Sequence, residues 1–158
     1  MKPKTIIITA ALGLFALSRA RGAGRDLKAL PIRNCDIGGC GHFGASRGDR
    51  LHNGIDLLAA AGTTVKTSFT GKVERYIDPY GDGQYNGLQI REMNTGHVYK
   101  IMYLNPSVKI GETVSKGSKI GTVQDISKKY KGVPHHLHIE LIINGSWVDP
   151  APYLKPTL

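Results

Sequence analysis

Two short groups of residues carry side chains that can bind a metal ion. The first is the segment His52-Asn53-Gly54-Ile55-Asp56, which offers an imidazole nitrogen and a carboxylate oxygen. The second is His136-Leu137-His138, in which one residue separates two imidazoles. Histidine and aspartate are zinc ligands, and a catalytic zinc takes three protein ligands and a water. The two groups therefore predict a zinc site, with one histidine of the second group beside the bound water.

Each motif alone also has an ordinary structural interpretation. An H-x-H pair on a strand can be an exposed polar face, and His52 with Asp56 can form an ion pair in a loop. For the metal site, we expect Gly54 to let the backbone turn so that His52 and Asp56 converge. His135 should point to the opposite face of the strand from its neighbour and serves as an internal control.

Strand-like segments must position these groups. Residues 136–143 alternate between polar and apolar, which predicts a half-buried strand with both histidines and Glu140 on one face. Asn144-Gly145 predicts a hairpin turn into a short strand at 146–148, and Asp149-Pro150 should end the ordered part. Further strands are expected at 62–69, 71–77, 87–92 and 97–104, with a turn at 94–96 and glycine corners at 111, 117 and 121.

This pattern predicts an all-β fold, a small antiparallel β-sheet core with long loops at 35–50 and 124–134. No amphipathic helix and no internal repeat is found in the sequence. With 158 residues, 41% hydrophobic and 21% charged, the chain fits one globular domain. Its 20 glycines and 8 prolines are scattered, which excludes a collagen-like chain.

The N-terminus is typical of an exported protein. A basic start at 1–4, an apolar stretch at 5–17 and Ser18-Arg19-Ala20 predict a signal peptide at 1–20 and a secreted, extracellular product that does not span a membrane. A flexible leader is expected at 21–34, a single zinc-binding β-domain at 35–154 and a tail at 155–158.

The two cysteines, Cys35 and Cys40, are both in the expected mature chain. In an oxidising compartment an even count favours one disulfide that closes a small loop. The competing interpretation is a C-x4-C metal site, but the chain has no second cysteine pair to complete it.

The charge predicts anionic partners. Loss of Lys2, Lys4 and Arg19 with the signal peptide lowers the net charge from +9 to +6. Glycans, cell-wall polymers or membrane surfaces fit such a bias, although solubility alone also explains it. The lysines at 128, 129 and 131 could steer an anionic partner or simply belong to a solvated loop. No stacking-aromatic or recognition-helix pattern predicts nucleic-acid binding.

The motifs resemble a known family. His52–Asp56, followed by Ala61-Gly62-Thr63-Thr64-Val65, is similar to the first zinc motif of the lysostaphin-type peptidoglycan endopeptidases, and His136–Glu140 is similar to the second. The segments 111–121 and 144–150 resemble the β-core of that family, so the resemblance covers about residues 50–154. It implies one Zn²⁺ held by His52, Asp56 and His138. It also implies that His136 is the general base that activates water for attack on a peptide amide.

One position departs from this pattern. The family has a second catalytic histidine in a Tyr-Ala-His-Leu stretch, which corresponds here to Ile101-Met102-Tyr103-Leu104. Tyr103 therefore replaces a catalytic histidine. A phenol can donate a hydrogen bond to an oxyanion, but its pKa near 10 makes it a poor acid–base partner. His97 lies about 20 Å away along an extended strand and cannot substitute.

Tyr103 and the Cys35–Cys40 loop also resemble a group of secreted animal chemotaxins on this fold. These proteins keep zinc, are regarded as lacking peptidase activity, and signal to cells. The chain lacks their further cysteine pairs, and its end, NGSWVDPAPYL, is closer to the bacterial enzymes. We expect a zinc-binding recognition, signalling or immune protein with weakened or absent catalysis, which meets peptidoglycan, another anionic glycan or a cell-surface receptor. The alternative is an active zinc metalloendopeptidase that cleaves peptidoglycan peptide bonds; a third is a basic binding module.

Overall fold

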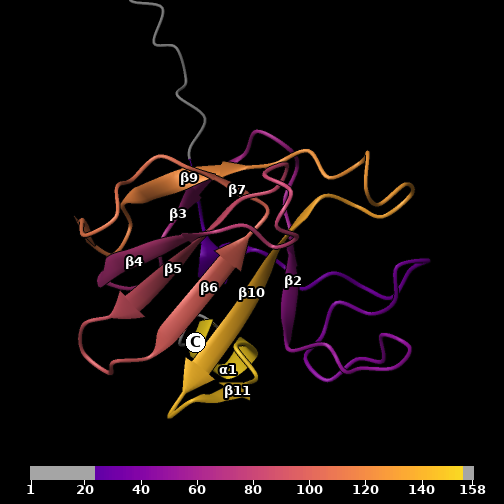
Figure 1. Ribbon diagram of the computed structural model, residues 1–158, viewed down its shortest axis with the longest axis horizontal. Coiled ribbons are helices and arrows are strands. Elements are labelled where there is room, and N and C mark those ends of the chain that lie inside the picture. The colour runs from indigo at the N-terminus through magenta and orange to yellow at the C-terminus, as the bar shows by residue number, and fades with distance from the viewer. Residues whose placement is uncertain (1–23, 155–158) are drawn as a thin grey trace, which may run out of the picture.

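The longest strand, β10 (His136–Ile143), lies next to one edge of the larger of two sheets in the computed structural model, which describes residues 24–154 (Figure 1). Its side chains alternate as the sequence predicts. Leu137, Ile139 and Leu141 are fully buried in the hydrophobic core, whereas His138 and Glu140 on the other face are only half-buried. One face of β10 therefore anchors the core and the other is free to carry chemistry.

Antiparallel pairing builds the larger sheet around β10 in the order β11-β10-β6-β5-β4-β8, and β2 pairs with β10 as well. Its other strands are β2 (Gly54–Leu58), β4 (Gly71–Ile77), β5 (Gly87–Glu92), β6 (Val98–Met102), β8 (Thr113–Val114) and β11 (Ser146–Val148). Strands β2 and β11 share one edge of β10, because β2 pairs with its first half and β11 with its second.

A smaller sheet in the order β1-β3-β9-β7 lies at the top of Figure 1. Its strands are β1 (Arg25–Asp26), β3 (Thr64–Lys66), β7 (Leu104–Pro106) and β9 (Lys119–Val123). Two short helices complete the chain, the 3₁₀ helix η1 (Leu27–Ala29) and the α-helix α1 (Ala151–Leu154). Buried residues of both sheets, such as Val65 and Leu88, form one hydrophobic core, and the all-β fold class is confirmed.

The predicted turns are present. Asn144 and Gly145 have φ values of 51° and 81°, the left-handed conformations of a tight hairpin turn between β10 and β11. Gly111 and Gly117 also have positive φ at their corners, and a turn at 93–95, followed by Gly96 with positive φ, joins β5 to β6.

The structure differs from the sequence prediction near both ends of the described chain. Residues 24–34 are not a loose leader, because Arg25 and Asp26 pair with β3 while Leu27 and Leu30 are buried in the core. Order also continues past Asp149-Pro150 into α1, whose Leu154 is buried. The predicted signal peptide at 1–20 and the tail at 155–158 lie outside the described residues.

Two strands also differ from the prediction. The expected strand at 97–104 is interrupted at Tyr103, where φ is 62° and the chain passes from β6 into β7. Strand β2 was not expected, because its residues do not alternate: the first four of its five residues are all buried.

Gly54 has a different role from the expected turn. It begins β2 opposite Glu140, and a Cβ atom there would lie 2.2 Å from the backbone oxygen of Ile139. Gly121 is similar: it lies within β9 rather than at a corner, and a Cβ would lie 2.3 Å from the backbone oxygen of Asn105. Glycine therefore permits close approach of neighbouring backbones at both positions.

We predict that Gly54→Ala lowers the free energy of unfolding by about 3 kcal/mol, because backbone atoms of β10 must move to admit the methyl group. Gly44→Ala is the control: unlike Gly54, Gly44 has a positive φ, which strains any side chain, but nothing lies within 4 Å of its Cβ position, so the cost should be about 1 kcal/mol. Urea denaturation measures both, and equal losses would contradict the close-approach explanation.

Candidate metal centre

The pairing of β2 with β10 brings the two sequence motifs together. Asp56 on β2 lies directly opposite His138 on β10, although 82 residues separate them in the chain. His52 precedes β2 in a loop whose backbone is tied by hydrogen bonds to Gly44 and Ala45. The sheet register fixes two of the side chains, and this loop supplies the third.

Three donor atoms converge at this point. The Nδ1 atom of His138 lies 3.0 Å from Oδ1 of Asp56 and 3.0 Å from Nε2 of His52, and these last two atoms are 3.2 Å apart. Around a tetrahedral zinc with bonds of about 2.0–2.1 Å, ligand atoms lie about 3.3 Å from each other. The spacing of the three atoms therefore suits one small divalent ion, as the sequence predicted.

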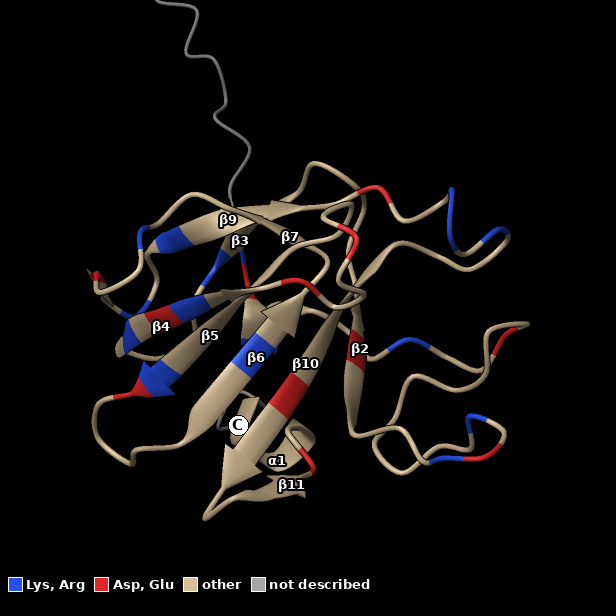
Figure 2. Ribbon diagram, in the orientation of Figure 1, with Lys and Arg blue, Asp and Glu red and all other residues tan. Residues whose placement is uncertain are grey.

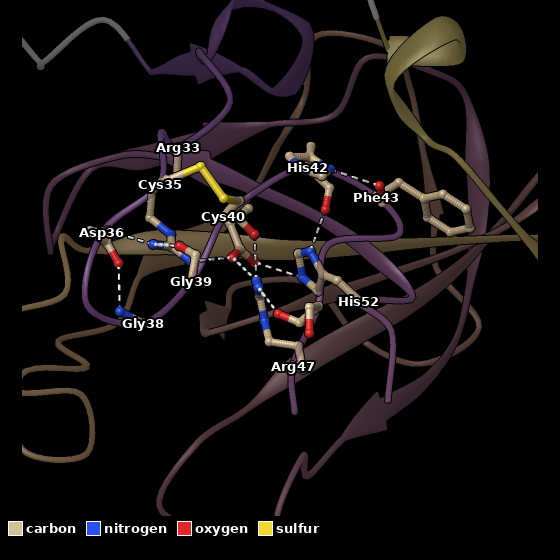
Figure 3. Close-up of a disulfide and its surroundings, with 12 residues drawn as sticks. Arg33, Cys35, Asp36, Gly38, Gly39, Cys40, His42, Phe43, Arg47 and His52 are labelled. Carbon is tan, nitrogen blue, oxygen red and sulfur yellow. Dashed lines mark hydrogen bonds and ion pairs between the residues drawn. A yellow bond between two sulfur atoms is a disulfide. The ribbon is translucent and has the colours of Figure 1, made fainter. Parts of the chain in front are cut away.

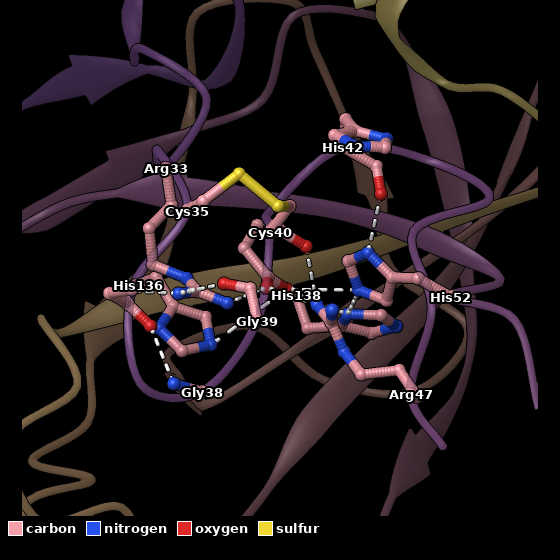
Figure 4. A network of polar contacts seen from close by, with 12 residues as sticks. Arg33, Cys35, Gly38, Gly39, Cys40, His42, Arg47, His52, His136 and His138 are labelled. Carbon is pink, nitrogen blue, oxygen red and sulfur yellow. Dashed lines mark hydrogen bonds and ion pairs between the residues drawn. A yellow bond between two sulfur atoms is a disulfide. The ribbon is translucent and has the colours of Figure 1, made fainter. Parts of the chain in front are cut away.

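The hydrogen bonds of the two rings support this assignment. The Nδ1 atom of His52 lies 2.8 Å from the carbonyl oxygen of His42 (Figure 4). Because a carbonyl only accepts, Nδ1 carries the hydrogen and Nε2 presents a lone pair. The Nε2 atom of His138 lies 3.5 Å from Oε1 of Glu140, which favours the hydrogen there and a lone pair on Nδ1. These three lone pairs suit a bound cation; without a cation, the imidazoles of His138 and His52 instead donate hydrogen bonds to Oδ1 of Asp56.

The second oxygen of Asp56 is held by two arginines. Its Oδ2 accepts hydrogen bonds from Arg33 at 2.9 Å and from Arg47 at 3.3 Å. Burial would raise the pKa of Asp56, but the facing imidazoles of His138 and His52 outweigh it and keep this pKa well below its usual range. Asp56 is thus a buried, ionised carboxylate with Oδ1 directed at His52 and His138, and we call these three metal-donor atoms the donor cluster.

The disulfide loop positions both arginines. Cys35 and Cys40 are bonded, as predicted, and the loop between them presents its carbonyl groups inward (Figure 3). The carbonyl of Gly39 accepts from Arg33 at 3.0 Å, and that of Cys40 accepts from Arg47 at 2.7 Å. Arg33 also contacts the carboxylate of Asp36. Sequence reasoning missed both arginines, and it had placed Arg33 in a flexible leader.

His136 lies beside the donor cluster without joining it. Its Nε2 atom is 3.8 Å from Oδ1 of Asp56, and its Nδ1 donates to the carbonyl of Pro134 at 2.8 Å. The lone pair of Nε2 therefore faces the site. Burial lowers the pKa of His136 despite the nearby Asp56, so this ring is neutral and able to accept a proton.

Glu140 links His138 to two neighbouring strands. Its Oε2 accepts hydrogen bonds from Lys100 on β6 and from the indole nitrogen of Trp147 on β11, each at 3.0 Å. Burial would raise the pKa of Glu140, but the contacts with His138, Trp147 and Lys100 lower it to about 2. The carboxylate is ionised at neutral pH and suited to orient the imidazole of His138.

Tyr103 is one of three tyrosines whose hydroxyl groups meet. Its hydroxyl lies 2.5 Å from that of Tyr80 and 3.2 Å from that of Tyr130, which also contact each other. Its ring packs edge-on against His136, with centroids 5.5 Å apart. Burial and the neighbouring hydroxyls raise the pKa of Tyr103, which keeps it a protonated phenol. Tyr80 and Tyr130, on separate loops, had no sequence signal.

These side chains line a groove of about 500 Å³ on the outer face of the larger sheet. Its walls include the loop around Cys35–Cys40 and the loop at 124–134. The two loops touch, since a Cβ on Gly38 would lie 2.7 Å from Val133 and one on Gly132 would lie 2.8 Å from Ile37. The two loops therefore meet beside the groove, whose lining includes both Gly38 and Val133.

Positive residues are spread over several elements of the fold (Figure 2). Arg50, Arg75 and Lys100 line it together with the two arginines on Asp56. In the loop at 124–134, the amine of Lys129 lies 3.6 Å from the ring centre of Tyr80, which places that lysine near the mouth.

The remaining histidines of the prediction lie elsewhere. His135, the internal control, points to Asp125, with 3.8 Å between Nε2 and the carboxylate. His97 packs against Tyr153 and does not line the groove, in agreement with the expectation that it cannot replace the missing catalytic histidine.

Comparison with known proteins identifies the class. Residues 50–150 match the model of peptidase family M23, and the chain belongs to this family. The catalytic domain of the antimicrobial peptidase lysostaphin from Staphylococcus simulans superposes with a TM-score of 0.56 at 33% identity, covering 75% of this chain and 90% of that one. The lysostaphin-type fold expected from the two motifs is thus confirmed.

Within the family, the chain is similar to leukocyte cell-derived chemotaxin-2 of Mus musculus, at 37% identity over 158 residues, which cover 98% of this chain and 100% of the relative. It is also 32% identical to lysostaphin of Staphylococcus simulans over 144 residues, 85% of this chain but only 28% of that protein. The similarity to the chemotaxin extends across nearly the whole chain. Within residues 24–154, no helix is long and apolar enough to cross a membrane.

We predict that Arg33→Met lowers the free energy of unfolding by about 3–5 kcal/mol, because it removes a buried partner from the buried carboxylate of Asp56. Arg91→Met is the matched control, since Arg91 pairs with Glu74 at a half-exposed site and should cost at most about 1 kcal/mol. Chemical denaturation compares them. If Arg33→Met lowers the free energy of unfolding no more than Arg91→Met does, the ion pair between Arg33 and Asp56 is not important for stability.

Proposed function

We propose that the protein is a secreted zinc-binding member of family M23 that acts by recognition, as a signalling or immune protein of chemotaxin type, with weakened or absent peptide hydrolysis. The similarity to leukocyte cell-derived chemotaxin-2 supports a signalling role in broad terms. That similarity and the Cys35–Cys40 disulfide support an extracellular location. The predicted signal peptide at 1–20 and a zinc domain at 35–154 belong to this proposal.

The observation that carries the recognition role is Tyr103 with its partners. A bound zinc ion would supply Lewis acidity and acidify a water. His136 can accept a proton at Nε2, but the position of the second catalytic histidine is taken by Tyr103, whose phenol contacts the hydroxyl groups of Tyr80 and Tyr130. A protonated phenol can donate a hydrogen bond but cannot exchange protons near neutral pH. Loss of a general acid–base group typically lowers the rate by about 10²–10⁴.

A second candidate is an active zinc metalloendopeptidase that cleaves peptidoglycan peptide bonds. The lone pair of His136, directed at the donor cluster from 3.8 Å, favours it, because a purely structural metal needs no adjacent base. For either function, we propose that the groove meets peptidoglycan, another anionic glycan or a cell-surface receptor, and no nucleic acid.

We predict that the purified chain binds one zinc ion through His52, Asp56 and His138. Zinc at 100 times its Kd should add about 2.7 kcal/mol of stability, so a chelator should lower the Tm by several degrees. His52→Ala should remove both the metal and the chelator effect. His42→Ala is the control, because its exposed side chain is lost while the backbone carbonyl that orients His52 remains. Metal analysis and thermal melts test this; a zinc-free protein or a chelator-insensitive Tm would refute it.

We predict that Tyr103→His raises peptide release from peptidoglycan at least tenfold over the wild type. Histidine is among the residues that tolerate the positive φ of this position, so the fold should persist. In that background His136→Ala should abolish release, whereas His135→Ala should not. Peptide release is measured by chromatography of digested cell walls. Efficient release by the wild type that Tyr103→Phe abolishes would instead make the phenol a catalytic donor and overturn the recognition-only proposal.

A further inference from the structure

The turn between β10 and β11 carries a feature that the metal centre does not use. Only two asparagines in the chain have serine or threonine two residues later, Asn105 and Asn144. Enzymatic glycosylation of asparagine requires this triplet and excludes proline in the middle. Asn105-Pro106-Ser107 is therefore blocked, and Asn144-Gly145-Ser146 is the single complete acceptor sequence.

The fold presents this triplet at the surface. Asn144, Gly145 and Ser146 are all exposed, and the positive φ values of the first two place them at the tip of the hairpin. Nothing in the structure uses the side chain of Asn144: no hydrogen bond to its amide occurs within residues 24–154. An exposed surface loop is where a glycosylated asparagine lies in a secreted protein.

The turn is also far from the groove. Asn144 follows His138 by six positions along an extended strand, which corresponds to about 20 Å. In Figure 1 the turn lies at the lower end of the β10 arrow, away from the loops that surround the metal centre. A large substituent on Asn144 would leave the groove accessible.

The same turn begins an edge of the larger sheet. Strand β11 lies at the edge of the larger sheet, and the side chain of its Trp147 is 49% exposed. Exposed edge strands with apolar residues are sites of unwanted pairing between molecules. A polar oligosaccharide at the start of β11 would shield this edge.

We propose that Asn144 is an N-glycosylation site of the exported protein. The amide nitrogen of Asn144 bonds to the anomeric carbon of a lipid-diphosphate-linked oligosaccharide. The bond from that carbon to the diphosphate oxygen breaks, the amide nitrogen loses one proton, and the lipid diphosphate leaves. This chemistry is independent of zinc and of catalysis in the groove.

The experiment expresses the full chain, with its own residues 1–23, in an animal cell line and analyses the medium. We expect a glycoform that peptide-N-glycosidase collapses to the unmodified mass while converting Asn144 to aspartate, identified by peptide mass spectrometry. Asn144→Asp, which keeps a residue suited to the turn, and Ser146→Ala, which leaves the turn residues unchanged, should both remove the glycan. Ser146→Thr should retain it.

Asn105→Gln is the matched control and should leave the glycoform unchanged, because Pro106 blocks that triplet. Secreted protein without a glycan, unmodified protein retained inside the cell, or a glycan that persists in Ser146→Ala would each overturn the proposal.

Discussion

The antiparallel pairing of β2 with β10 is the constraint on which the candidate site depends. This register places Asp56 opposite His138 and leaves both side chains on the outer face, while Ile55 and Ile139 are buried in the core. A shift by one residue would send every side chain of β2 to the other face. Gly54 allows the backbones of β2 and β10 to approach closely. The pairing of these two strands therefore positions both the core residues on one face and the metal-donor atoms on the other.

Charge compensation is the second requirement of this arrangement. A buried carboxylate is stable only when its charge is paired and its oxygens are hydrogen-bonded. Asp56 meets that requirement by dividing its oxygens, with Oδ2 on Arg33 and Arg47 and Oδ1 on the histidines. The disulfide loop holds both guanidinium groups through its backbone carbonyls, so it serves the site although it contributes no metal ligand.

The sequence predicted those parts that depend on local pattern. Strict alternation marked β10, and the spacing of His136 and His138 placed both rings on one face. What it could not predict depends on partners distant in the chain. Arg33 lies in a basic, glycine-containing segment that has the composition of a loose leader, and its role is evident only when Asp56, 23 residues later, is placed beside it. Strand β2 lacks alternation because it is buried on both faces. The hydroxyl cluster of Tyr103 brings together residues from separate loops, which no local pattern encodes.

The most direct test of the central claim is a crystal structure of the zinc-loaded chain with anomalous data collected at the zinc edge. We expect one strong peak within about 2.0–2.2 Å of Nε2 of His52, Oδ1 of Asp56 and Nδ1 of His138. A peak elsewhere, or no peak between these three atoms at saturating zinc, would contradict it.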